Sequence, residues 1–157
     1  MFIVTISAIA RMSDASDVGH AGTLQDLVLR HDERHIRRRV LRLADGRRAL
    51  FDLAEPTLLS DGDVLELDDG ERVRIVAADE DLYELRGSNQ RHLAELAWHI
   101  GNRHLPAEIA ADAIRILRDH VIRAMLEGLG ACVTEFRGPF APMRGAYAGA
   151  GGAAHHH

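Results

Sequence analysis

Short runs of alternating apolar and polar residues fill the first half of the chain, and Asp-Gly pairs separate several of them. Val40–Leu43 and Ala49–Leu53 flank the pair Asp45-Gly46, and two further Asp-Gly pairs follow. Alternation predicts half-buried strands, and Asp-Gly between two such runs predicts a β-hairpin. With an apolar first strand at Phe2–Ile9, residues 1–76 are predicted to form a small all-β domain of short strands, a sandwich or a barrel.

The second half of the chain begins with a predicted strand at Leu82–Arg86 and then changes to helical spacing. Apolar residues every three or four positions predict a helix over Asn89–Ile100. Ser88 or Asn89 can serve as its N-cap, and Gly101 suits the left-handed conformation after its last turn.

The segment Ala107–Leu129 permits either one long helix or two elements. Alternation at Ala113–Leu117 and a natural N-cap at Asp119 favour a strand followed by a helix that ends at Leu129. Cys132–Phe136 then supplies a last strand. Strand–helix–strand–strand–helix–strand is the element order of a ferredoxin-like fold.

The predicted fold class is therefore α+β, with three parts along the chain. Residues 1–76 form the all-β domain, residues 77–140 the ferredoxin-like domain, and residues 141–157 a flexible tail. The tail is assigned from its composition, because glycine and alanine dominate it and cannot build a core.

The bulk composition describes a soluble globular protein. Of the 157 residues 46% are apolar and 27% are charged, and no apolar run is long enough to span a membrane. The net charge of −5 argues against general nucleic-acid binding. The N-terminus lacks a basic leader with a cleavage region, so a cytoplasmic location is expected. The single cysteine, Cys132, excludes an internal disulfide and is expected to be an inert, buried thiol.

Charge is segregated inside the first domain. The basic residues come first, at Arg34, Arg37, Arg38, Arg39, Arg42, Arg47 and Arg48. The acidic residues follow, at Asp61, Asp63, Glu66, Asp68, Asp69 and Glu71. We favour a solvated sheet face with cross-strand ion pairs. The alternative is an arginine-rich surface that docks an acidic protein partner.

Candidate chemistry centres on histidine, because no nucleophile-and-base arrangement or phosphate loop is present. A metallohydrolase would need three ligands and a base, and that set is not found. His104 follows the predicted helix directly, on a connection that Pro106 restricts. One histidine cannot hold a divalent ion tightly, but two copies related by a two-fold axis could. His92 and His99, on the helix itself, are expected to pack or to face solvent.

Residues 82–130 resemble the UreE-type urease accessory proteins, which are dimeric nickel metallochaperones. The most specific stretch is HLAELAWHIGNRHLPAEI, with RDHVIRAMLEGLGACV after it. The β-rich first half with its arginines, the stretch LSDGDVL at Leu59–Leu65 and the histidine-ending tail are also similar to that family. The resemblance covers nearly the whole chain.

This resemblance implies an N-terminal domain that binds a peptide or a partner and a ferredoxin-like C-terminal domain that binds metal. The key nickel ligand of the family is the histidine of Gly-Asn-Arg-His, here His104, paired across a homodimer. His120 matches a second family position, and Arg118 stands where some members carry another histidine. Members of the family often end in a long histidine-rich tail, whereas this chain has only His155, His156 and His157, which are either native residues or an expression remnant.

The resemblance further implies Ni(II) as cargo, with Zn(II) or Cu(II) as competitors. Because neutral imidazoles capture the metal, the affinity is expected to fall as the pH drops. The expected partners are the GTPase accessory protein and the apo-urease complex, with no nucleic acid and no membrane, and the protein is not an enzyme. The rival interpretation is a metal-independent assembly factor that binds apo-urease through its β domain.

Overall fold

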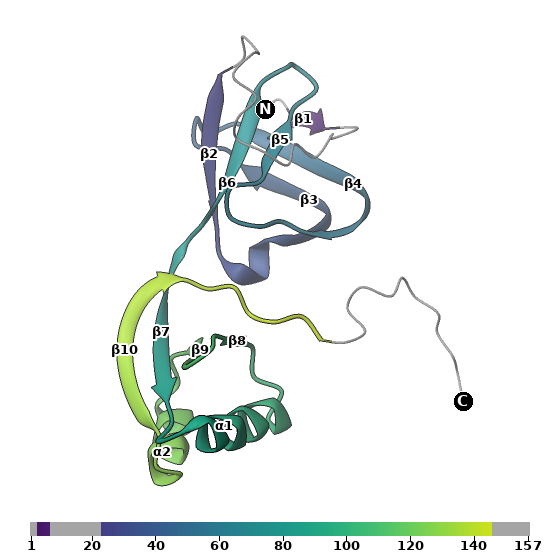
Figure 1. The fold of residues 1–157 in the computed structure, drawn as a ribbon. Coiled ribbons are helices and arrows are strands. Elements are labelled where there is room, and N and C mark those ends of the chain that lie inside the picture. The colour runs from purple at the N-terminus through teal and green to yellow at the C-terminus, as the bar shows by residue number, and fades with distance from the viewer. Residues whose placement is uncertain (1–2, 7–22, 146–157) are drawn as a thin grey trace, which may run out of the picture. The chain divides into compact units, whose positions relative to one another are not determined.

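Two units of the chain, residues 1–79 and 80–157, each fold around a core of their own in the computed structural model. The structure describes residues 3–6 and 23–145 (Figure 1). Short strands dominate both units, and both α-helices of the described residues lie in the second. The fold is therefore α+β and rich in sheet, as the alternating pattern predicted.

The first unit consists of strands and one short 3-10 helix. Its elements in chain order are β1 (Ile3–Ile6), β2 (Leu24–Leu29), η1 (His31–Glu33), β3 (His35–Arg42), β4 (Arg48–Leu58), β5 (Val64–Glu66) and β6 (Arg72–Ala77). They form two three-stranded sheets with the orders β1-β4-β3 and β2-β6-β5. Alternate residues of both sheets, such as Ala49 and Phe51 on β4 and Val73 and Ile75 on β6, belong to one buried cluster. The remaining residues of the strand predicted at Phe2–Ile9 lie outside the described residues.

Two predicted hairpins are confirmed: one Asp-Gly turn joins the antiparallel strands β3 and β4, and another joins β5 and β6. Gly46 and Gly70 have φ angles of 88° and 85°. Glycine adopts this left-handed conformation without the steric cost that a Cβ brings. The turn chemistry of the sequence thus determines the strand pairing.

Arg47 connects these two turns through its guanidinium group. Its Nε donates a hydrogen bond to Asp45 at 2.7 Å within its own turn. Its Nη1 donates to Asp69 at 3.4 Å, and its Nη2 donates to Glu71, both at the other turn. One arginine therefore ties together two hairpins from different sheets.

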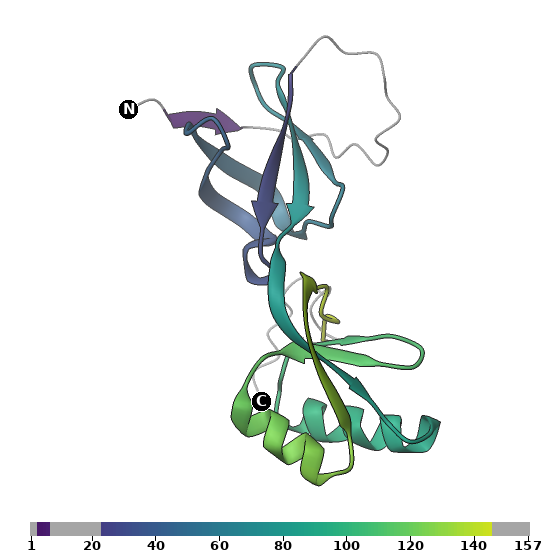
Figure 2. The same ribbon diagram turned by 90° about the vertical axis from the view of Figure 1, so that its left-hand side faces the viewer.

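The second unit has six elements in the predicted order. They are β7 (Asp79–Arg86), α1 (Gln90–Asn102), β8 (Ala107–Ile109), β9 (Ile114–Leu117), α2 (His120–Gly128) and β10 (Cys132–Pro139). The sheet order is β10-β7-β9-β8, so the first and third strands are central. Figures 1 and 2 both place α1 and α2 on the same side of this sheet. Leu93, Leu96 and Ile100 of α1 and Leu126 of α2 join the sheet residues in the core.

Two details of this unit differ from the sequence-based expectation. Strand β8 has only three residues and was not among the strand ranges read from the pattern, because so short a run carries no visible alternation. Cys132 is exposed rather than buried. It opens the edge strand β10, where successive side chains face opposite sides, so the burial of Ala131 does not extend to its neighbour.

The chain after β10 is held against β8 for several residues. Phe140 is fully buried. The Ala141 N–H donates to Glu108 Oε2 at 3.0 Å, and the Met143 N–H donates to the Ala107 carbonyl at 2.8 Å. The segment 141–157, predicted to be a flexible tail, therefore starts with anchored residues, and residues 146–157 lie outside the part of the chain that the structure describes.

Candidate metal site

Helix α1 carries the candidate ligand His104 just beyond its C-terminal end. The helix starts where predicted, because Asn89 Oδ1 accepts a hydrogen bond from the His92 N–H at 2.8 Å and so caps the first turn. At its other end the helix continues through Gly101 to Asn102. His104, with a φ of 56°, is the residue that leaves the helix in the left-handed conformation. The prediction that Gly101 would take this role is wrong.

The hydrogen bonds at the end of α1 explain this shift. The Leu105 N–H donates to the Ile100 carbonyl at 3.4 Å, and the His104 N–H donates to the Gly101 carbonyl at 3.0 Å. These two bonds form a Schellman motif with His104 at the C′ position, where glycine is usual. The motif normally brings an apolar residue back onto the helix, and Leu105 packs against the cluster that contains Ile100. Packing of Leu105, rather than the glycine, therefore sets the helix end.

The backbone of His104 is fixed while its imidazole is free. Among the described residues it is the only non-glycine residue with a positive φ. An L-residue in this region costs about 1–2 kcal/mol relative to the right-handed conformation, although histidine tolerates it better than most. The side chain is exposed, and it makes no hydrogen bond within the described part of the chain. Strain of this kind, retained at an exposed histidine, is typical of a functional position.

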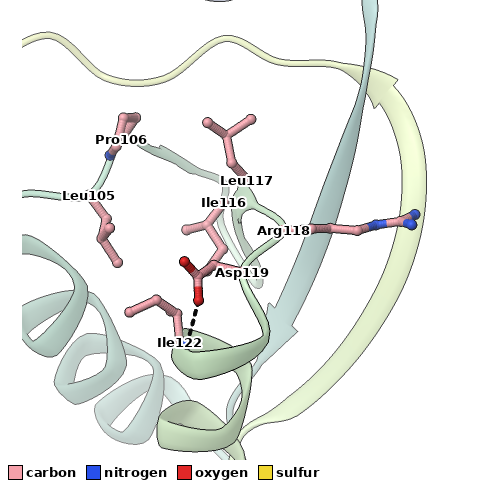
Figure 3. A pocket seen from close by; sticks show the side chains of 7 residues that line it. All are labelled: Leu105, Pro106, Ile116, Leu117, Arg118, Asp119 and Ile122. Atoms are coloured by element: carbon pink, nitrogen blue, oxygen red, sulfur yellow. Dashed lines mark hydrogen bonds between the residues drawn. The ribbon is translucent and has the colours of Figure 1, made fainter.

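An apolar hollow of about 250 Å³ lies directly beside this corner. Figure 3 shows its lining, which comes from the connection after α1, from β9 and from the start of α2: Leu105, Pro106, Ile116, Leu117, Arg118, Asp119 and Ile122. His104 adjoins one lining residue in the chain, and His120 adjoins another. Each of the two predicted ligands of the described chain is therefore a sequence neighbour of a residue that lines this hollow, although neither histidine lines it. The sequence did not reveal the hollow, because its walls come from three separate elements.

The two charged residues of the lining are engaged in holding the fold. Asp119 Oδ1 accepts hydrogen bonds from the Val121 N–H at 2.8 Å and the Ile122 N–H at 3.1 Å, and so caps α2 as predicted. Arg118 points away from the hollow toward β10 (Figure 3). Its Nε donates to the Leu82 carbonyl at 3.1 Å and its Nη2 to the Phe136 carbonyl at 3.0 Å. Arg118 therefore braces β7 and β10 and contributes no metal ligand.

The helix histidines have other roles. Nδ1 of His92 accepts a hydrogen bond from the Ser88 N–H at 2.9 Å, so the ring proton lies on Nε2, which donates to the Leu129 carbonyl at 2.8 Å. This neutral imidazole joins the start of α1 to the end of α2. His99 is half-buried and meets the ring of Trp98 edge-on, with centroids 5.0 Å apart. Both observations agree with the packing roles that we expected.

One chain does not assemble a complete site from its described residues. Within residues 3–6 and 23–145 no group of three histidine, cysteine, aspartate or glutamate side chains is placed to hold a metal ion. His104 and His120 are both exposed, and neither belongs to such a group. The tail residues His155, His156 and His157 lie outside the described residues. A tightly bound ion would need ligands from the tail or from another chain.

The arrangement defines a two-unit protein with an exposed, backbone-fixed histidine beside an apolar hollow. No helix in the described ranges has the length and apolarity needed to cross a membrane. Comparisons with known proteins identify the family. Residues 6–78 match the UreE urease accessory protein, N-terminal domain, and residues 80–157 match the UreE urease accessory protein, C-terminal domain.

Individual relatives agree with this family assignment. Urease accessory protein UreE of Mesorhizobium japonicum is 58% identical over 135 residues, which are 86% of this chain and 69% of the relative. Urease accessory protein UreE 1 of Brucella suis biovar 1 is 57% identical over 135 residues, 86% of this chain and 83% of the relative. The chain belongs to the UreE urease accessory protein family. It is accordingly an accessory protein of urease maturation and not an enzyme.

Proposed function

We propose that this protein is a nickel metallochaperone, which binds Ni(II) at a homodimer interface and delivers it for assembly of the urease active site. The observation that carries the proposal is the left-handed, exposed His104 at the end of α1, beside an apolar hollow. Imidazole is a good ligand for divalent nickel. A urease accessory protein with a histidine in this setting fits the task of handling the metal.

We infer the dimer because the described residues of one chain do not supply enough metal ligands. With no third ligand among the described residues, His104 needs donors from elsewhere. A two-fold axis presents the same residue from each subunit, so two copies of His104 can face one ion. The apolar lining of the adjacent hollow offers surface for a second copy to bury. His120, His155, His156, His157 and water are the groups that we assign to the rest of the coordination shell.

Such a site suits transfer rather than storage or catalysis. Exposed imidazoles, without a second layer of hydrogen bonds to hold their orientation, bind a metal reversibly. Cu(II) should bind more tightly than Ni(II) by the Irving–Williams order, and Zn(II) should compete. Selectivity then rests on the recipients, which we propose to be the GTPase accessory protein and the apo-urease complex in the cytoplasm.

We assign the two roles to the two units. Residues 77–140, with the strand order β10-β7-β9-β8 and two helices on one face, would be the ferredoxin-like metal-binding domain. Residues 1–76 would be the domain that binds a peptide or partner. Residues 141–157 would extend the metal-binding domain with the terminal histidines.

Isothermal titration with Ni(II) tests the proposal. We expect about one tight site per dimer in the unmodified protein and its loss in His104→Ala. His99→Ala is the matched control, because it removes a half-buried histidine from the same helix and should leave the tight site intact. Unchanged tight binding in His104→Ala would remove the assignment of His104. A protein that supports urease assembly without binding Ni(II) would instead be the metal-independent assembly factor.

A further inference from the structure

Five arginines on β3 and at the start of β4 are exposed and have no ion pair within the described residues. We call them the β3 arginine stripe: Arg37, Arg38, Arg39, Arg42 and Arg48. Arg47 and Arg74 of the same unit are ion-paired. Arg47 binds three carboxylates, and Arg74 on β6 binds Asp26 on β2 through Nε at 2.8 Å.

The favoured interpretation of the sequence, a face of cross-strand ion pairs, is therefore wrong for the stripe, and Arg47 forms its ion pairs at the two hairpin turns rather than across strands. Two of the acidic residues that this interpretation would pair with the stripe, Asp69 and Glu71, contact Arg47 instead. Asp52 stands opposite Arg38 in the strand register but forms no ion pair with it in the described structure.

The stripe also contains a pairing that weakens the sheet. Arg42 and Arg48 lie directly opposite each other on β3 and β4. Like charges at opposed positions destabilise an antiparallel pair. An anion from outside the chain, bound between these two side chains, would remove that cost.

The strand register places part of the stripe on one face with an apolar centre. Leu41 and Ala49 are paired and buried, so the residues on either side of them in sequence face outward. Val40 and Arg42 on β3 are two such neighbours, and Arg38 shares their face because it lies two residues before Val40. The side chain of Val40 is 46% exposed. A hydrophobic residue thus lies between two cations.

The spacing of the stripe selects an extended ligand over a small anion. Alternate residues of a strand are roughly 6.6 Å apart, so Arg38 and Arg42 are separated by about 13 Å. One phosphate or carboxylate group cannot bridge that distance. An extended polypeptide with carboxylates at every fourth position repeats at the same interval and can pair with both arginines.

The strand itself offers a way to hold such a peptide. β3 is the last strand of the sheet β1-β4-β3, so among the described residues only β4 pairs with it. The opposite edge presents main-chain donors and acceptors that an added strand can use. A nucleic acid strand could meet the arginines but could not continue the sheet, and the net charge of −5 opposes a long polyanion.

We propose that the β3 arginine stripe is a docking surface for an extended acidic segment of a partner protein, which adds as a strand to the edge of β3. Carboxylates four residues apart in the segment pair with Arg38 and Arg42, where Arg48 adds its charge beside Arg42, and an apolar residue midway between them contacts Val40. This surface lies in the first unit, so the proposal rests on the partner-binding role proposed above for residues 1–76 and not on the metal site.

Fluorescence anisotropy with a labelled peptide of Glu-Thr-Val-Thr repeats, in which glutamate and valine alternate along one face of the extended strand, tests this proposal on the full chain. The triple variant Arg38→Gln/Arg42→Gln/Arg48→Gln should bind the peptide more weakly by a factor on the order of ten. The control triple variant Arg86→Gln/Arg91→Gln/Arg137→Gln removes the same charge from ion-paired arginines of the second unit, and its affinity should stay within about twofold. A peptide of equal charge with alternate N-methylated amides, which cannot extend the sheet, should lose affinity as well.

Three results would overturn the proposal. Equal losses in the two triple variants would mean that only the overall charge attracts the peptide. Single-stranded DNA of the same length binding as tightly as the peptide would indicate a general polyanion surface. If the stripe variant bound the peptide unchanged but associated with itself, the role of the arginines would be to prevent pairing of the β3 edge with another copy of the chain. Circular dichroism of each variant establishes that it is folded.

Discussion

The left-handed conformation of His104 predicts that its replacement by glycine stabilises the fold while removing the metal ligand. An ordinary residue in this region costs about 1–2 kcal/mol. Glycine avoids that cost but loses about 0.4–1 kcal/mol because its unfolded chain has more freedom. The expected net stabilisation of His104→Gly is therefore roughly 0.5–1 kcal/mol. For a unit of this size, that gain corresponds to a rise of several degrees in melting temperature.

Trp98 provides the assay. It is the single tryptophan of the chain, it lies on α1, and it is 64% exposed. Its fluorescence during urea unfolding therefore reports on the second unit, and quenching of the same signal by Ni(II) reports on metal bound nearby. His104→Asn is the matched control, because asparagine also tolerates the left-handed region but brings no imidazole.

The expected order of stability is glycine above histidine and asparagine, with alanine lowest, and only the histidine protein should bind Ni(II) tightly. A glycine variant that is less stable than the original protein would refute the argument from strain. Tight Ni(II) binding by the asparagine variant would refute the argument from the imidazole. The two halves of the prediction can therefore fail separately.

Three further predictions concern other parts of the chain. His92→Ala should destabilise the second unit by about 1–3 kcal/mol, because two backbone groups lose their partner, and urea unfolding followed by Trp98 measures this. The hydrogen bond from the Arg47 backbone N–H holds the pKa of Asp45 below its ordinary value. The ionised Asp45 therefore contributes its full stabilisation at a pH above the ordinary pKa, and this stabilisation is lost as the pH falls through the lowered pKa. Acid unfolding of the first unit below about pH 4 should therefore be less steep in Asp45→Asn. Deleting His155–His157 should reduce the number of Ni(II) ions bound, as counted by titration, while the tightest site remains; loss of all binding would move that site to the tail.

Local chemistry made much of the fold predictable from the sequence. The Asp-Gly pairs at Gly46 and Gly70 encode their turns in two residues, and Asn89 and Asp119 cap their helices through side chains adjacent to the first turn. Each of these signals depends only on neighbours in the chain. The structure therefore shows each of these turns and caps where the sequence predicts it.

The features that sequence reasoning missed depend on contacts between distant segments. Gly101 was the natural helix terminator by residue type, but the packing of Leu105 onto the α1 cluster moved the left-handed position to His104. Cys132 has apolar neighbours in sequence, yet the sheet places it at an exposed edge. Three separate segments line the hollow beside His104, so no single stretch of sequence predicts it.

The bridge made by His92 has a consequence for how the protein handles its many histidines. A metal ion meeting this chain encounters several imidazoles, and an accessory protein works only if the ion is not retained at the wrong one. Both ring nitrogens of His92 already bond to backbone groups, so coordination there would require the loss of either the bond to Ser88 or the bridge to Leu129 at the end of α2. The fold thus withdraws one of its histidines from the competition for metal and leaves the exposed imidazole of His104 available at the end of the same helix.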